Sequence, residues 1–171
     1  MNGMKKLMRW HLSTDGMRKV LLFLIGGLVA ALLCCEQSFA YPIRVLDGDT
    51  FEMNGERYRL YGVDCPEKKQ PYGQEARQAT SRHLYSVKPR ISLVGKDHYG
   101  RNLAIVHIGD ATLQELLLAE GAAWLYTDYC RTIECVKWGY IHLKARAKGL
   151  GIWSYDDPVP PWEWRKERKN R

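Results

Sequence analysis

The sequence predicts an α+β domain, built mainly from short β-strands, that follows an N-terminal export segment. Residues 43–108 contain five short runs with the alternation and turn boundaries typical of strands. Runs with helical spacing lie between the third and fourth strands and after the fifth. This order matches a five-stranded OB-type Greek-key barrel, here with three helices, which is a fold much used for nucleic acids.

The first 40 residues have the layout of a secretory signal peptide. Five Lys or Arg residues precede an uncharged apolar run, Val20–Leu33, and Ser38-Phe39-Ala40 supplies small residues for cleavage before Tyr41. The run is shorter than the roughly 18 residues of a membrane-spanning helix, so a cleaved signal is favoured and an uncleaved anchor facing outward is the alternative. Lipid attachment at Cys34-Cys35 is disfavoured, because Leu33 stands where a small residue is expected. Export to the periplasm or the medium is therefore predicted.

The charge suits a polyanionic partner without establishing one. The whole chain has a net charge of +7, and the first 40 residues contain five basic and two acidic residues, which leaves +4 for the remainder. Many exported proteins are basic for solubility alone, so this balance only permits nucleic acid as a partner.

The strand prediction begins with a three-stranded meander. Its strands are residues 43–46, 50–53 and 56–61. Asn54-Gly55, between the second and third, is the strongest short hairpin signal. Residues 90–94 and 102–108 are the fourth and fifth strands.

Three helices are expected in the domain, which is predicted to cover residues 41–153. The first covers residues 74–85, and the second begins at a capping box, Thr112 to Glu115, and ends at Gly121. The third runs from about residue 132 to 148. Its predicted buried face is Val136, Tyr140, Leu143 and Ala147.

Residues 154–171 are predicted to be an irregular tail, because their prolines resist regular structure. The basic ending RKERKNR either holds nucleic acid electrostatically or is simply solvated, and the sequence does not choose between these.

Three cysteines follow residue 40. Cys130 and Cys135 are close in sequence and are the expected disulfide in an oxidising compartment. Half of a metal site is the alternative, but no second Cys or His cluster completes it. Cys65 is left without a partner.

Three acidic segments lie at turns next to predicted strands: Asp47-Gly48-Asp49-Thr50, Asp64-Cys65-Pro66-Glu67 and Asp97-His98-Tyr99-Gly100-Arg101. Two carboxylates at i and i+2 lie on one side of an extended chain and repel each other unless a cation is near. Each segment alone is better explained as an ordinary polar turn. Taken together, the three segments are not explained as ordinary turns, because their order along the chain matches a known pattern.

Three motifs, in this order, resemble those of the thermonuclease family, whose type member is staphylococcal nuclease: DGDT, RLYGVDCPE and DHYGR. The resemblance covers essentially all of residues 42–153, including AEGAAW after the second helix and the closing GLGIW. It implies a monomeric, calcium-dependent endonuclease that acts on DNA and RNA, preferably single-stranded, with little sequence preference and no obligate protein partner.

The resemblance assigns metal-binding roles to the first two segments. Asp49 and Asp64 look like the calcium-binding carboxylates, with the backbone carbonyl of Cys65 as a further ligand and Asp47 as a carboxylate beside the metal. Carboxylate, carbonyl and water oxygens are the ligands that Ca²⁺ prefers. The family usually has threonine or another small residue at Cys65, so a thiol beside the site raises the question of oxidation.

The resemblance also implies the catalytic groups. Glu67 looks like the carboxylate that activates the attacking water, and Arg59 and Arg101 look like the two guanidinium groups that hold the phosphate. Tyr99 matches the family's tyrosine against the nucleotide. Arginine presents a fork that matches phosphate oxygens, which agrees with this assignment.

Two points depend on the fold. Strict alternation would put Arg59 and Asp64 on opposite faces, and a bulge at Gly62 would correct this. Tyr126 is predicted to line a groove for base stacking, whereas Trp124 is expected to close the end of the barrel.

A non-catalytic, membrane-tethered OB-fold module that binds nucleic acid is the rival prediction, disfavoured because all five implied metal and catalytic side chains are present.

Overall fold

The computed structural model describes residues 42–170, so the predicted signal peptide lies outside the described residues. Its strands are β1 (Ile43–Asp47), β2 (Thr50–Met53), β3 (Glu56–Leu60), β4 (Val63–Asp64), β5 (Arg90–Lys96), β6 (Asn102–Ile108), β7 (Ala111–Thr112) and β8 (Trp124–Leu125). Its helices are α2 (Gly73–Ser86), α3 (Leu113–Glu120), α4 (Glu134–Ala147) and α5 (Pro161–Lys169), with short 3-10 turns η1 (Thr127–Tyr129) and η2 (Gly151–Ser154). No helix in this part of the chain is long and apolar enough to cross a membrane.

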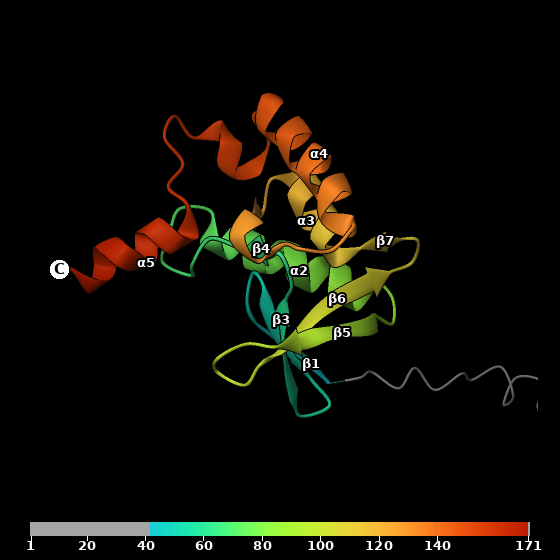
Figure 1. The fold of residues 1–171 in the computed structure, drawn as a ribbon. Coiled ribbons are helices and arrows are strands. Elements are labelled where there is room, and N and C mark those ends of the chain that lie inside the picture. The colour runs from blue at the N-terminus through green and yellow to red at the C-terminus, as the bar shows by residue number, and fades with distance from the viewer. Residues whose placement is uncertain (1–41, 171) are drawn as a thin grey trace, which may run out of the picture. The chain divides into compact units, whose positions relative to one another are not determined.

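The main sheet has the strand order β1-β2-β3-β6-β5, with β7 paired to β6 (Figure 1). The predicted meander is confirmed, since β1, β2 and β3 pair antiparallel in sequence order. The turn between β2 and β3 is formed by Asn54 and Gly55, both with positive φ, as a tight hairpin of this kind requires. A parallel pairing of β3 with β6 then joins the meander to the second half of the sheet.

The predicted five-stranded OB-type barrel with three helices is corrected in its strand and helix counts and in its barrel details. Within residues 42–170 there are eight strands and four α-helices, and β1 and β5 are the two ends of the main sheet rather than partners. β4 and β8 form a separate two-stranded ladder. The two-residue strands were missed because they are too short to show alternation and depend on distant partners. The α+β class, mainly sheet, stands.

Helices cover one side of the sheet, where the core lies (Figure 1). α2 packs on β1 and α3 on β6, while α4 packs on α3. The predicted capping box of α3 is confirmed: Thr112 accepts from the Glu115 N–H, and Gly121 ends the helix in the left-handed conformation. Fully buried side chains fill the space between these layers: Phe51, Leu60, Leu84, Val106, Leu113, Leu117, Leu118 and Trp138.

The buried face predicted for α4 is wrong. Val136, Tyr140 and Leu143 are all more than half exposed, whereas Trp138 and Ala145 are buried. The apolar residues of this helix are spread around its circumference, so periodicity alone does not select one face. The face of the helix that carries Trp138 packs against the core.

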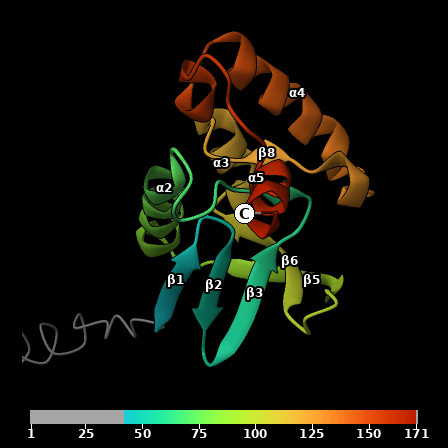
Figure 2. The ribbon, with the colours of Figure 1, turned by 90° about the vertical axis from the view of Figure 1, so that its left-hand side faces the viewer.

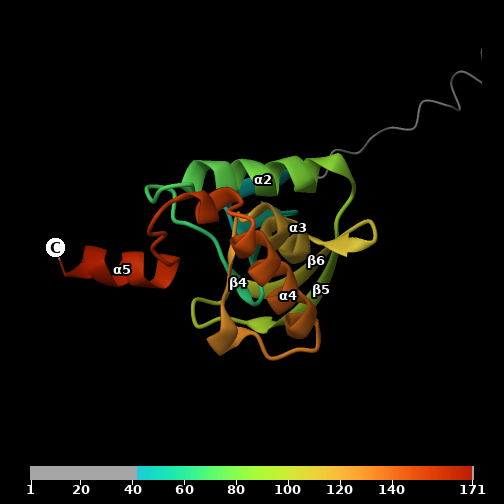
Figure 3. The same ribbon diagram turned by 90° about the horizontal axis from the view of Figure 1, so that it is seen from above.

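The predicted irregular tail is also corrected, because it contains α5. Pro161 is at the start of this helix, where a missing N–H costs nothing and the fixed φ favours the first turn. Figure 2 shows α5 end-on, and Figure 3 shows it projecting from the body of the domain with the C-terminus at its outer end.

Candidate active site

A cleft of about 720 Å³ collects most of the predicted site residues. This is a usual size for a ligand-binding cleft. Its lining includes Asp47, Asp49, Arg59, Glu67, Tyr99, Arg101 and Tyr126. Asp64 and Cys65 lie directly behind it, almost completely buried. The structure therefore brings together in one place three segments that are far apart in the sequence.

The turn Asp47-Gly48-Asp49 is fixed by close packing against two other parts of the domain. A Cβ atom on Gly48 would lie 2.5 Å from the Cβ of Cys65, so no side chain fits there. The Thr80 hydroxyl of α2 donates to the Gly48 carbonyl, and the Cys65 N–H donates to Asp49 Oδ2 at 3.0 Å. This packing explains why glycine separates the two aspartates.

Arg59 and Asp64 do meet, although simple alternation puts them on opposite faces. Arg59 Nη2 donates to Asp64 Oδ1 at 2.7 Å. The correction comes from a turn between β3 and β4 rather than from a bulge, since Gly62 has a φ of 72° and β4 leaves the main sheet to pair with β8. Arg59 also forms an ion pair with Asp49, so one guanidinium bridges both predicted metal carboxylates.

The buried carboxylates are unequally compensated. Burial opposes ionisation of Asp49, but the charge of Arg59 and the bond from the Cys65 N–H outweigh it and lower its pKa. Burial raises the pKa of Asp64 despite its bonds to guanidinium groups, with the charge of Asp49 adding to the effect. Burial, together with the charge of Asp49, raises the pKa of Asp47 to about 6. The neighbouring positive charge and hydrogen bonds therefore outweigh the cost of burial at Asp49 but not at Asp47 or Asp64.

Glu67 reaches the cleft from the loop after β4, and it is held by a residue that the sequence analysis did not single out. Arg165 of α5 donates to Glu67 Oε1 at 2.8 Å and to both oxygens of Asp64, at 2.7 and 3.2 Å. Pro161 at the helix start was a sequence signal for α5. Nothing in the sequence indicated that this helix would dock at the site.

Arg101 and Tyr99 line the same cleft from the turn between β5 and β6. Arg101 Nε donates to Asp97 Oδ2 at 2.6 Å, and the Arg101 guanidinium lies 5.4 Å from the centre of the Tyr99 ring. Tyr99 is 74% exposed, so its ring is available to a ligand. The bond from Nε to Asp97 fixes the orientation of the Arg101 side chain, and the guanidinium faces the cleft.

The aromatic residues divide between cleft and core. Tyr126 lines the cleft, but one face of its ring is stacked on Trp162, with 4.9 Å between centroids. The neighbouring Tyr129, which the sequence analysis did not select, also lines the cleft. Trp124 is buried in a small cluster with Trp153, so it packs rather than binds.

The cysteines behave as two separate cases. Cys130 and Cys135 form a disulfide, as predicted. Cys65 is free and 3% exposed, and burial raises the pKa of its thiol well above the usual value. Because the thiolate is the reactive form, we expect this cysteine to resist oxidation.

Asp49, Asp64 and the nearby carboxylates fit a hard divalent cation by charge and by donor type. Asp47, Asp49, Asp64 and Glu67 face two guanidinium groups, those of Arg59 and Arg165, which leaves a surplus of negative charge. Within the described part of the chain, no three Asp, Glu, His or Cys side chains are arranged to hold a metal by themselves. Backbone oxygen and water would therefore complete the shell, as is usual for Ca²⁺.

Comparison with known proteins shows the family of the chain. Residues 57–155 match the family model described as staphylococcal nuclease homologue. An uncharacterized endonuclease of Haemophilus influenzae is 30% identical over 159 residues, covering 89% of this chain and 88% of that protein. An uncharacterized endonuclease of Escherichia coli is 34% identical over 139 residues, covering 78% and 89%.

A plant relative is longer than this chain. The staphylococcal-like nuclease CAN1 of Arabidopsis thaliana is 35% identical over 113 residues, which cover 66% of this chain but 34% of the plant protein. The chain thus spans about a third of its plant relatives and most of its bacterial ones. The matched region and the bacterial coverage confirm the predicted relationship: the chain belongs to the staphylococcal nuclease homologue family.

Proposed function

We propose that this protein is an exported, calcium-dependent endonuclease that hydrolyses phosphodiester bonds of DNA and RNA with little sequence preference. The observation that carries the proposal is the convergence of Glu67 and Arg101 with the group Asp49–Arg59–Asp64 at one cleft. The names of the relatives, nuclease and endonuclease, support the same reaction class.

The reaction adds water to an anionic phosphorus centre, so negative charge accumulates as the barrier is approached. A bound Ca²⁺ would supply charge neutralisation at the phosphate, and Asp49, Asp64 and the Cys65 carbonyl would hold it. Arg101 faces the cleft and offers its free N–H groups to a phosphate oxygen. Arg59 is mostly buried between two carboxylates, so its contribution depends on redistribution of those bonds when the ion and substrate are present.

Glu67 is the group that we assign to the attacking water. Its side chain is 28% exposed at the cleft, so it can accept a hydrogen bond from water next to a bound phosphate. A carboxylate is a weak base, and its main role is to hold that water in line and accept the proton as the new P–O bond forms.

The cleft also supports the proposed substrate class. Tyr99 is exposed beside Arg101 and can stack on any base, because every base has a π-face. Contacts to phosphate and to ring faces carry no sequence information, and they need no 2′-hydroxyl. We expect single strands to be preferred, since stacking requires bases that are not paired, and we expect the protein to act as a monomer.

A cleavage assay tests this function. The described residues 42–170 belong to one compact unit, so protein without the N-terminal segment is suitable material. It is incubated with single-stranded DNA and with RNA, in calcium and in excess chelator. We expect internal cleavage of both in calcium and none in chelator. Binding without cleavage in calcium would instead favour the non-catalytic OB-fold module.

Export is a separate part of the proposal. It rests on the basic opening, the apolar run Val20–Leu33 and the small residues before Tyr41. Expression of the full chain in a Gram-negative host, followed by fractionation and N-terminal sequencing, tests it. We expect a periplasmic or secreted product that begins at Tyr41. A full-length product in the membrane fraction would indicate the uncleaved anchor.

A further inference from the structure

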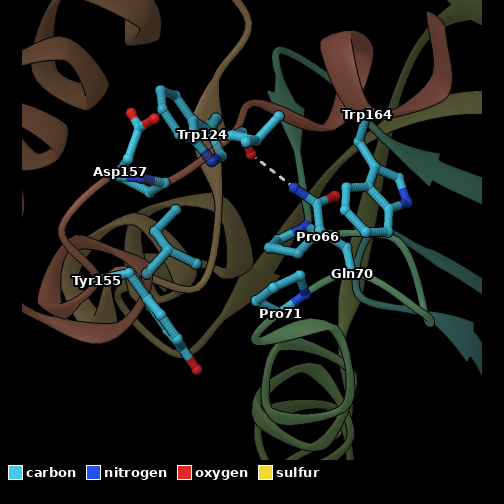
Figure 4. Close-up of a pocket in the computed structure, with 10 residues that line it drawn as sticks. Pro66, Gln70, Pro71, Trp124, Tyr155, Asp157 and Trp164 are labelled. Atoms are coloured by element: carbon cyan, nitrogen blue, oxygen red, sulfur yellow. Dashed lines mark hydrogen bonds between the residues drawn. The ribbon is translucent and has the colours of Figure 1, made fainter. Parts of the chain in front are cut away.

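Helix α5 lies outside the region that matches the family model, yet it is fastened to the body of the domain near its N-terminal end. Pro161 is buried, and Trp162 stacks on Tyr126 with an interplanar angle of 6°. Just before the helix, Gln70 Nε2 donates to the Val159 carbonyl at 2.6 Å. Figure 4 shows this bond in a small pocket that Trp164 helps to line. The first turn of α5 is therefore fixed at several points.

The next residue after this anchored turn is Arg165, and its guanidinium lies among the cleft carboxylates. Nη1 donates to Glu67 Oε1 and to Asp64 Oδ1, while Nη2 donates to Asp64 Oδ2. For Glu67, Arg165 is the one side-chain cation paired with its carboxylate in residues 42–170. The Glu67 backbone is held separately, since its N–H donates to Gln70 Oε1, the same side chain that holds Val159.

We propose that Arg165 is a positioning residue of this site: α5 carries its guanidinium into the cleft, where it holds the Glu67 carboxylate in its working orientation. The inference rests on the proposed nuclease function. It makes the C-terminal segment a part of the active site and not an appended basic tail.

The geometry explains why an arginine stands here. A glutamate on a loop has several rotamers, and only some of them point its carboxylate at a water beside the phosphate. One planar group that bonds two carboxylates at once fixes their separation and their relative orientation. Asp64 is completely buried and serves as the fixed side of this arrangement. The bond from Arg165 then restricts the Glu67 side chain, which lies on a loop, to one orientation.

Arg165 also retains capacity for the substrate. A guanidinium has five N–H donors, and the bonds to Asp64 and Glu67 use three of them. The side chain is 39% exposed, so the remaining donors can reach a phosphate oxygen in the cleft. The positioning role predicts an effect on kcat, while a phosphate contact made only at binding would appear in KM.

The test compares arginine variants in the hydrolysis of a single-stranded deoxyoligonucleotide at saturating calcium. We expect Arg165→Ala to lower kcat by about 100-fold, the size of effect that a misplacement of roughly 1 Å produces, with a much smaller change in KM. Arg165→Lys should recover part of the loss, because an ammonium can hold one carboxylate but lacks the planar fork. Arg168→Ala is the matched control on the exposed part of α5, and its kcat should stay within about twofold of wild type.

A double-variant cycle separates positioning from a general structural role. If Arg165 acts through Glu67, then Arg165→Ala should cost little in a Glu67→Gln background, where the carboxylate to be positioned is already gone. Calcium affinity of each variant is measured by calorimetry, and thermal melting verifies the fold. We expect Arg165→Ala to melt close to wild type, because the helix is anchored by Trp162 and Val159.

Three results would overturn the inference. The first is wild-type kcat in Arg165→Ala. The second is an equal loss from Arg165→Ala with and without Glu67. The third is higher activity together with tighter calcium binding in Arg165→Ala, which would mean that the guanidinium competes with the cation for Asp64. An inactive wild-type protein would instead overturn the proposed function, and this inference with it.

Discussion

Single residues in the cleft differ in how their charge is balanced. Asp49 receives bonds from Thr50, from the Cys65 N–H and from Arg59, and its pKa is lowered against the cost of burial. Asp47 receives only the neighbouring Gly48 N–H among the bonds in the described part, and its pKa rises to about 6. Asp47, with little compensation of its charge, therefore lies beside the well-compensated Asp49. A cation bound between them would stabilise the ionised form of both.

Glu67→Gln tests the assigned catalytic group. The amide keeps the size of the side chain but cannot accept a proton from water, so we expect turnover to fall by about 100- to 10,000-fold, the usual range for a general base. Binding of a single-stranded oligonucleotide, followed by fluorescence anisotropy in chelator, should be largely retained. An equal loss of binding and turnover would mean that Glu67 is structural.

Cys65 should be inert in the folded protein. Its thiol is buried, and burial keeps its pKa well above the usual value, so little thiolate is present at pH 8. In protein without residues 1–40, which contain Cys34 and Cys35, we expect no labelling by iodoacetamide in native conditions and labelling of one cysteine after unfolding without reductant. Rapid labelling of the native protein, with loss of activity, would contradict the buried position.

At the level of elements, the turn between β3 and β4 determines the site. β3 carries Arg59 in the main sheet, and β4 carries Asp64 in the small ladder with β8. Gly62 provides the left-handed conformation that redirects the chain. A Cβ at this position would also lie 2.7 Å from Cys130 Sγ, so the disulfide leaves no room for a side chain.

Gly62→Ala should destabilise the domain and disturb the site together. Strain at positive φ costs about 1–3 kcal/mol, and the contact with the Cys130 sulfur adds to it. Chemical denaturation measures the loss. Gly109→Ala is the matched control, because Gly109 also has positive φ but faces open space. Equal losses in both variants would show that packing at Gly62 contributes nothing.

Prediction from sequence succeeded for elements whose evidence is local. The hairpin at Asn54-Gly55 and the cap of α3 follow from short-range chemistry, and both are present. The numbers of strands and helices and the buried face of α4 depend on which distant segments pair and pack, and there the sequence prediction was wrong. Local signals cannot report such choices, because the free energy that decides them comes from tertiary contacts.

At the level of the whole domain, the surplus of carboxylates links ion binding to stability. A ligand that binds only the folded state stabilises it by about 2.7 kcal/mol at a concentration one hundred times its Kd. We therefore expect calcium to raise the melting temperature by several degrees and chelator to reverse the effect. Calorimetric scans at a series of calcium concentrations measure it.

Two variants serve as controls for this linkage. Asp49→Asn removes one predicted ligand and should abolish most of the calcium-dependent shift. Asp110→Asn removes an exposed carboxylate in the turn between β6 and β7, so the shift should persist. A shift of equal size in both variants would mean that calcium stabilises the protein elsewhere.

The sequence by itself determined the family, the main strands and the identity of the implied metal and catalytic side chains, because DGDT, RLYGVDCPE and DHYGR are contiguous motifs. Only the tertiary structure decided that a turn at Gly62 joins Arg59 to Asp64, and that α5 places Arg165 against Glu67. The physical reason is separation along the chain: residues 67 and 165 meet only through the docking of Trp162 and Val159 on the folded body.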